Sequence, residues 1–235
     1  MRINQYLAKC GICSRRAADK LISSGQVLVD GEIATMGQDV TENNTVLYNG
    51  TPVRLPSETI VIAYYKPVGV TCTEKDTHAE RTVVDEIKSE RRITYAGRLD
   101  KESEGLLLMT DDGDLINAMM RSSNKHEKEY VVTVNKPFSD DILYEMSQGV
   151  FLKELNQTTR QCEIKKIDDV TFNIVLTQGL NRQIRRMCSA FGLKVVKLKR
   201  TRVMNIELGN LQVGASRILL PEEKEALYLE SGLHR

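Results

Sequence analysis

The sequence lacks any apolar run that approaches the roughly 20 residues a helix needs to cross a bilayer. It also lacks the apolar segment of a signal peptide, because Met-Arg-Ile-Asn-Gln at its start leads into polar residues. The five cysteines are scattered and odd in number, so they provide no even disulfide framework. We therefore expect a cytoplasmic protein with reduced thiols and no membrane attachment.

The signatures of several enzyme classes are missing as well. The chain has no Walker loop, no dinucleotide-binding fingerprint and no nucleophile-elbow serine. Cys10 and Cys13 have redox or zinc spacing, but no second pair or nearby histidine completes four ligands. Asp111, Asp112 and Asp114 could bind a cation, although a turn and a helix N-cap explain this cluster better. We expect no metal at either place.

Charge is nearly balanced in total but unevenly distributed. The net charge is +1, from 33 basic and 32 acidic residues, so the total says nothing about nucleic acid. The first twenty residues hold five cations and one carboxylate, and residues 182–202 hold eight cations and no carboxylate. A single basic run is usually a solvated face, but two acid-poor blocks in one chain favour RNA binding.

Residues 1–56 are predicted to form a small module of two helices and short strands. Residues 3–9 and 14–24 have the pattern of helices, the second with Ser14 as its N-cap. The Asp30-Gly31 turn predicts a hairpin between residues 26–29 and 33–34, and a strand at 45–48 follows. Residues 51–58, which contain two prolines, have the composition of a linker.

Residues 57–235 are predicted to form a larger domain. We expect strands at 60–65, 106–110, 129–134, 162–166, 172–177 and 195–198, and helices at 83–90, 114–120, 140–148, 182–191 and after Pro221. Because these elements mix without a regular βαβ rhythm, we expect an α+β fold with a mixed, largely antiparallel sheet.

The most informative segment is Tyr95-Ala-Gly-Arg-Leu-Asp-Lys-Glu-Ser-Glu-Gly-Leu-Leu-Leu-Met-Thr110. Its small-residue turn presents Arg98 and Asp100 just before an apolar strand, at a loop-to-core junction where catalytic groups are often placed. By physics alone, an ordinary turn or capping aspartate is the more common explanation of Asp100.

Several ordered motifs resemble those of the RsuA and RluF family of pseudouridine synthases. They are Lys66-Pro67 with Gly69, Gly97-Arg98-Leu99-Asp100, Glu104-Gly105-Leu106-Leu107, Thr110-Asp111-Asp112-Gly113, Lys128-Glu129-Tyr130 and residues 178–187. Residues 14–18 and 25–31 resemble the αL RNA-binding domain first described in a small-subunit ribosomal protein. The resemblance covers nearly the whole chain, and residues 124–137 and 180–188 look most like the RluF branch.

The resemblance implies an RNA isomerase without metal or organic cofactor. It makes Asp100 the catalytic carboxylate, Tyr130 the aromatic that stacks on the target base, and Arg185 the cation paired with Asp100. Expected substrate-binding residues are Arg98, Leu198, Arg182, Arg186 and Lys66; expected RNA-docking residues are Arg2, Lys9, Arg15, Arg16, Lys20, Lys199, Arg200 and Arg202. The expected substrate is a uridine of large-subunit ribosomal RNA, with another structured RNA such as tRNA left open, and the protein is expected to act as a monomer.

The chemistry of pseudouridine formation agrees with these roles. The reaction breaks an N-glycosidic bond and rejoins the same base to the same sugar through carbon, so it needs no redox group. It does need a carboxylate that is ionised in a pocket of low dielectric, and a neighbouring guanidinium opposes protonation there. If the Asp100–Arg185 pair is buried, removing Arg185 should cost about 3 to 5 kcal/mol of stability.

Two other functions fit parts of the sequence. One is a non-catalytic RNA-binding or ribosome-assembly factor on the same fold, against which the joint presence of Asp100, Tyr130 and Arg185 argues. The other is a nucleic-acid hydrolase that uses the Asp111 cluster with magnesium.

Overall fold

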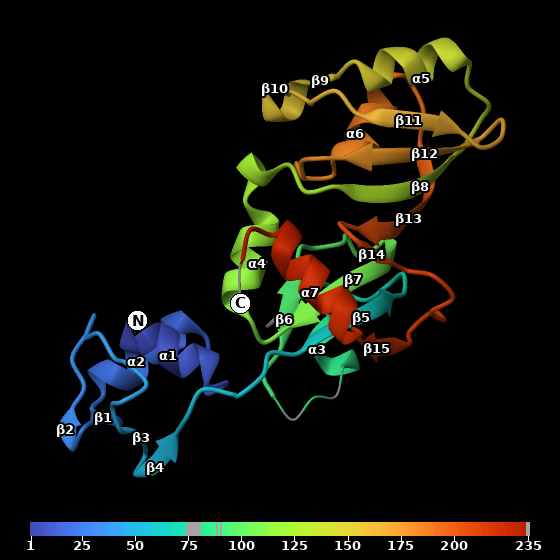
Figure 1. Ribbon diagram of the computed structural model, residues 1–235. Helices are drawn as coiled ribbons and strands as arrows, with labels where there is room; N and C mark the ends of the chain where they lie inside the picture. Colours follow the sequence, from blue (N-terminus) through green and yellow to red (C-terminus); the bar gives the residue numbers. More distant parts are fainter. Residues whose placement is uncertain (74–80, 88, 90, 234–235) are drawn as a thin grey trace. The chain divides into compact units, whose positions relative to one another are not determined.

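The computed structural model describes residues 1–73, 81–87, 89 and 91–233. The chain divides into two compact units (Figure 1). One comprises Met1–Ile60 with Ser89–Thr94 and Thr110–Gly113, and the other comprises the remaining residues. None of the helices in the described residues has the length and apolar character that a bilayer span requires.

The first unit packs two helices on a small antiparallel sheet. Its elements are α1 (Ile3–Lys9), α2 (Arg15–Ser23), β1 (Val27–Val29), β2 (Glu32–Ile33), β3 (Val46–Tyr48) and β4 (Thr51–Val53), with the strands in the order β2-β1-β3-β4. The predicted cap of α2 is confirmed, because the Ser14 hydroxyl accepts a hydrogen bond of 3.3 Å from the Ala17 amide. Such a cap contributes about 1 kcal/mol to helix stability. Leu7 and Ile22 carry the apolar helix faces into a core with Val27 and Val46.

The prediction that residues 51–58 are entirely linker is wrong for residues 51–53. These residues form β4, which pairs with β3 at the edge of the sheet. Pro52 is compatible with this position because an edge strand leaves some backbone N–H groups without a ladder partner. The domain boundary after residue 56 stays a prediction.

The second unit is built on a nine-stranded mixed sheet with the order β11-β12-β8-β13-β7-β5-β15 and two short flanking strands. Its elements are β5 (Val61–Lys66), α3 (Val83–Glu86), β6 (Thr94–Ala96), β7 (Glu104–Thr110), α4 (Gly113–Met120), η1 (Ser122–Asn124), β8 (Lys128–Val134), α5 (Asp140–Ser147), β9 (Phe151–Leu152), η2 (Lys153–Leu155), β10 (Gln157–Thr158), β11 (Glu163–Lys166), β12 (Thr171–Leu176), α6 (Gln183–Ala190), β13 (Val195–Val203), β14 (Ile206–Glu207), β15 (Ser216–Ile218) and α7 (Pro221–Glu230). β13 runs parallel to β7 and antiparallel to β8. The predicted α+β class with a mixed sheet is therefore confirmed.

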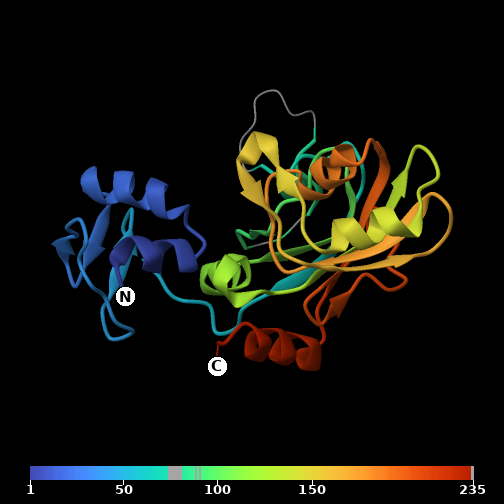
Figure 2. The same cartoon turned by 90° about the horizontal axis from the view of Figure 1, so that it is seen from above.

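Two apolar clusters hold the helices against this sheet. One joins α5 and α6 to β8 and β12 through residues such as Met146, Met187 and Phe172. The other joins α4 and α7 to β5 and β7 through residues such as Leu115 and Leu227. Figure 2 shows α6 in orange and α7 in red on opposite sides of the sheet. Strands β5 and β7 are buried along almost their whole length, as expected for strands that are covered on both faces.

β13 is much longer than the predicted strand at 195–198. It lies between β8 and β7 in the middle of the sheet and continues through the basic residues to Val203. Its charged residues are unlike those of a typical buried strand, and the strand was therefore predicted to end too early, at residue 198. The predicted helix at 83–90 is also shorter, ending at Glu86, and residues 88 and 90 lie outside the described part of the chain.

Gly105 allows the backbones of β7 and β13 to approach closely. Its φ is +110°, and a Cβ atom there would lie 2.2 Å from the carbonyl oxygen of Arg200, its partner in the sheet. We expect Gly105→Ala to lower the free energy of unfolding by about 3 kcal/mol or more, since both strain and overlap must be relieved.

Urea unfolding of the Gly105→Ala variant measures this cost. Gly113→Ala is the matched control, because nothing lies within 4 Å of a Cβ at Gly113 and its φ is ordinary. Wild-type stability of both variants would show that β7 and β13 are not packed as described.

Candidate active site

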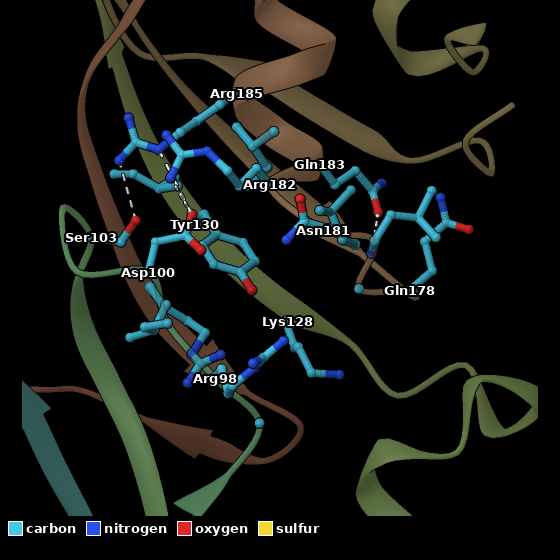
Figure 3. Close-up of a pocket in the computed structure, with 18 of the residues that line it drawn as sticks. Arg98, Asp100, Ser103, Lys128, Tyr130, Gln178, Asn181, Arg182, Gln183 and Arg185 are labelled. Atoms are coloured by element: carbon cyan, nitrogen blue, oxygen red, sulfur yellow. Dashed lines mark hydrogen bonds and ion pairs between the residues drawn. The ribbon is translucent and has the colours of Figure 1, made fainter. Parts of the chain in front are cut away.

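A pocket of about 440 Å³ opens beside the turn at residues 97–103. Its walls come from this turn, β8, the segment before α6, α6 itself and β13. In Figure 3, Asp100 and Tyr130 project into it, with Arg182 and Arg185 on one side of them in the view and Arg98 and Lys128 on the other. The volume is typical of a site for a small molecule or a single nucleotide.

The turn between β6 and β7 holds Asp100 at the pocket wall. Gly97 begins the turn with φ +83°, and the Ser103 amide donates a 3.0 Å hydrogen bond to the Asp100 carbonyl. The Leu99 amide donates to the Cys72 sulfur at 3.4 Å. The Asp100 side chain stays 33% exposed, so its carboxylate is accessible from the pocket.

Two guanidinium groups face this carboxylate. Arg182 Nη1 lies 3.5 Å and Arg185 Nε lies 3.9 Å from Asp100 Oδ2. The predicted partner Arg185 is therefore present, and Arg182 shares its task. Because Asp100 is one-third exposed, the condition of a buried pair is not met, and the cost of 3 to 5 kcal/mol does not apply. A partly exposed ion pair contributes about 1 kcal/mol or less to stability.

Arg185 also holds the backbone of the turn that carries Asp100. Its Nη2 atom donates to the Glu102 carbonyl at 3.3 Å and to the Ser103 hydroxyl at 3.2 Å. Its Nη1 atom donates to the Val195 carbonyl at 3.4 Å. One side chain thus ties α6, β13 and the turn together, which fixes where Asp100 can lie.

Arg182 stands at the N-cap of α6 in the left-handed region, with φ +52°. This conformation is uncommon for a residue with a side chain, and such positions cluster at functional sites. Besides Asp100, Arg182 binds Glu102 Oε2 at 3.0 Å, and this hydrogen bond lowers the pKa of Glu102. The Arg182 charge is therefore divided between two carboxylates.

Strand β8 supplies Lys128 and Tyr130 to the same pocket. They are two residues apart and both line the cavity, as the alternation of a strand requires. Burial, together with the nearby charge of Arg200, lowers the pKa of Lys128 to about 8. Leu198 of β13 is buried and contributes an apolar part of the wall. Lys128 was not predicted as a site residue, although its i, i+2 spacing from Tyr130 was the available signal.

Two predicted substrate-binding residues, Lys66 and Arg186, do not line the pocket. Lys66 is fully buried, and its ammonium donates to the carbonyls of Pro67 and Ser103 at 2.8 and 2.7 Å. Burial lowers its pKa to about 8. Arg186 pairs with Glu154 at 3.1 Å and donates to the Asn181 carbonyl. Neither side chain lines the cavity, so direct contact with a pocket-bound base is not supported for them.

The predicted RNA-docking residues of β13, which are Lys199, Arg200 and Arg202, do not form a continuous exposed surface. Arg200 is only 1% exposed, so the expectation that it docks RNA at the surface is wrong. Arg202 is engaged by Glu127 and Glu129, each at 2.9 Å, and the Lys199 ammonium lies 5.5 Å from the centre of the Tyr65 ring. The reason is that this run is a central strand, where alternate side chains point into the protein.

The predicted RNA-docking residues among the first twenty residues are more exposed. Arg15, Arg16 and Lys20 are on the surface of the first unit, around α2. Arg2 is also exposed but pairs with Asp39 at 3.6 Å and donates to the Gly37 carbonyl. Lys9 is half-buried at the end of α1.

The aspartate cluster has a structural explanation. Asp111 accepts a 2.9 Å hydrogen bond from the Ile60 amide and pairs with Arg91 at 3.3 Å. Across the described ranges, no three side chains with metal-ligating groups come together.

The Cys10 thiol, which has a second cysteine at zinc spacing, is partly buried, and this burial raises its pKa to about 11.

Comparison with known proteins points to one family. The family model described as RNA pseudouridylate synthase matches residues 60–190, and that of the S4 domain matches residues 1–46. The chain is 43% identical to the dual-specificity RNA pseudouridine synthase RluF of Escherichia coli K12, over 95% of this chain and 77% of the relative. It is 33% identical to the ribosomal large subunit pseudouridine synthase B of Bacillus subtilis, over 96% and 95%. A crystal structure of a pseudouridylate synthase aligns with TM-score 0.71 and 26% identity, covering 97% of this chain and 99% of that one.

Proposed function

The chain belongs to the RNA pseudouridylate synthase family and carries an RNA-binding S4 domain, and from this premise we propose that it converts a specific uridine of large-subunit (23S) ribosomal RNA to pseudouridine. The name of the B. subtilis relative, a ribosomal large subunit pseudouridine synthase, supports this choice of RNA. The E. coli relative is called dual-specificity, so a second RNA is worth testing, and tRNA is the other structured RNA that the sequence analysis left open. A transcript of each RNA, incubated with the protein and then mapped for pseudouridine, separates the two.

The proposed roles rest on one arrangement, a carboxylate flanked by two guanidinium groups opposite an aromatic ring. Asp100 acts on the target nucleotide, while Arg185 and Arg182 compensate its negative charge. Tyr130 stacks on the uracil, which must leave the RNA stack to reach the pocket, at a cost of a few kcal/mol. Stacking returns about 1 to 3 kcal/mol. Exposed Arg98 and apolar Leu198 complete the contacts to the nucleotide.

We also propose that the protein acts as a monomer in the cytoplasm. The turn at residues 97–103, β8, α6 and β13 of a single chain bring the pocket residues together. All five cysteines are free thiols, which fits a reducing compartment.

Charge reversal on α2 tests the docking role of the first unit. We expect Arg15→Glu with Arg16→Glu to weaken RNA binding and flatten its salt dependence, because each lost phosphate contact removes about 0.7 to 0.9 from the log-log slope. Binding titrations between low and moderate salt measure this slope. An unchanged slope would mean that α2 does not face the RNA. Charge reversal at the exposed Lys165, which already pairs with Glu163, is not expected to change the slope.

A further inference from the structure

The pocket holds more positive charge than Asp100 can balance. Five cations line it, and Asp100 is the one carboxylate among its described lining residues; the cations are Arg98, Lys128, Arg182, Arg185 and Arg200. Arg182 and Arg185 face Asp100 or Glu102. Among the described residues, none forms an ion pair with Lys128 or Arg200, so no carboxylate of this part of the chain balances their charges directly.

Arg200 is the more deeply placed of these two cations. Its side chain is 1% exposed, and its Nε atom donates to the Leu106 carbonyl at 2.6 Å. Its Nη2 atom is buried and has no hydrogen-bond partner among the described residues. A buried cation without a counterion is costly, and so is a buried donor without an acceptor. Both point to a negatively charged or strongly accepting group that arrives with the substrate.

Lys128 has a similar surplus of donors at a more accessible place. Its ammonium carries three donors, but its hydrogen bond within the described structure is a long one of 3.4 Å to the His126 carbonyl. The sheet places both cations around Tyr130. Arg200 is the cross-strand partner of Tyr130, and Lys128 is two residues away on the same strand, so the three side chains share one face.

We propose that Lys128 is a further catalytic residue, whose ammonium donates a hydrogen bond to a carbonyl oxygen of the uracil as the base separates from the sugar. Arg200, the cross-strand partner of Tyr130, is a positioning residue that adds positive potential. This inference rests on the proposed function. It explains why two unpaired cations lie beside the ring that is expected to stack on the base.

The chemistry of the step calls for such a group. When the C1′–N1 bond breaks, its electron pair stays with the uracil, and the negative charge spreads over N1, O2 and O4. The C5–C1′ bond then forms, C5 loses its proton and N1 gains one, so the atoms of substrate and product are the same. A preorganised cation at a carbonyl oxygen is most effective in a site that excludes water, where electrostatic stabilisation is large.

A backbone phosphate is the less suitable ligand for this pair. Phosphates of a nucleotide inserted into the pocket stay with the RNA backbone at its mouth, where exposed Arg98 is available. Arg200 is shielded from that surface. The base, in contrast, enters beside Tyr130 and brings its carbonyl oxygens to the cations.

Lys128→Met and Lys128→Arg test this role, because the first removes the charge at similar length and the second keeps it. The RNA transcript that the wild-type protein converts serves as substrate in single-turnover reactions with enzyme in excess. We expect Lys128→Met to lower the rate constant about 100-fold, the loss typical of one donor to a developing negative charge. The Kd for RNA and its salt slope should change little, and Lys128→Arg should recover most of the rate. Circular dichroism and thermal melting confirm that both variants are folded.

Three results would overturn the proposal. One is a Lys128→Met rate within threefold of wild type, and another is equally low rates for both folded variants. The third is weaker binding with a salt slope reduced by about one, which would make Lys128 a phosphate contact instead. Failure of the proposed function is distinguishable from all three, because the wild-type protein itself would then convert neither RNA.

Discussion

Asp100→Asn is expected to lower the rate constant of pseudouridine formation by about 10⁴-fold or more while leaving the Kd for RNA within about threefold. The amide has nearly the same size and position as the carboxylate, but it carries no negative charge and cannot act as a nucleophile or base. Binding is preserved because RNA affinity comes mainly from cations that contact phosphates, not from this group. Single-turnover kinetics and an equilibrium binding assay on the same RNA separate the two effects.

Glu102→Gln is the matched control for this variant. Glu102 is two residues away on the same turn and also binds Arg182, but its side chain is 60% exposed and it does not line the pocket. We expect its rate to stay within about tenfold of wild type. Turnover of Asp100→Asn near the wild-type rate, or equal losses in the two variants, would show that Asp100 has no special chemical role.

Arg185→Gln is expected to lower the rate by about 10³-fold, whereas Arg182→Gln should lower it by only about tenfold. Both remove a charge near Asp100, but Arg185 also donates to Glu102 and Ser103 and so positions the turn. A displacement of about 1 Å at a reacting group can alone cost 10²-fold. The effect on stability should be about 1 kcal/mol, since Asp100 keeps contact with solvent and with Arg182.

Arg186→Gln provides the control on the same helix. Arg186 follows Arg185 directly, but it pairs with Glu154 and does not itself line the pocket. Its rate should remain near wild type. If Arg182→Gln lowered the rate more than Arg185→Gln, Arg182 and not Arg185 would be the main partner of Asp100.

Long elements with clear periodicity could be predicted from the sequence. The helices 3–9 and 140–148 and the strands 129–134 and 172–177 were placed to within about one residue, because each pairs an apolar repeat with a recognisable end. Strands β9, β10 and β14, of two residues each, were missed. They are too short for a sequence period to be measured, and each is defined by its pairing with a neighbouring strand.

The members of the site could also be predicted in part. Asp100, Tyr130, Arg98, Arg182, Arg185 and Leu198 all line one pocket, as their motifs indicated. The basic run at 197–202 was misleading because charge usually marks a surface, whereas here it lies on a central strand. Whether an arginine such as Arg200 faces solvent or the pocket depends on strand register, which a single sequence leaves open.

The stabilising role of Lys66 could not be predicted either. From the sequence alone, a lysine beside a proline at the end of a strand is interpreted as a solvent-exposed residue or a substrate contact. In the structure its ammonium bridges two backbone carbonyls, one of them in the turn that carries Asp100. Such a long-range contact, 37 residues apart in the chain, is set by the packing of β5 against β7.

The most direct test of the central claim, that Asp100 isomerises a uridine held in this pocket, is a map of pseudouridines in large-subunit ribosomal RNA from cells. Three strains are compared: one without this protein, and two that express either the wild-type or the Asp100→Asn protein in its place. We predict that at least one pseudouridine is absent from the first strain, returns with the wild-type protein and stays absent with Asp100→Asn. An identical set of pseudouridines in all three strains, or full restoration by Asp100→Asn, would contradict the account.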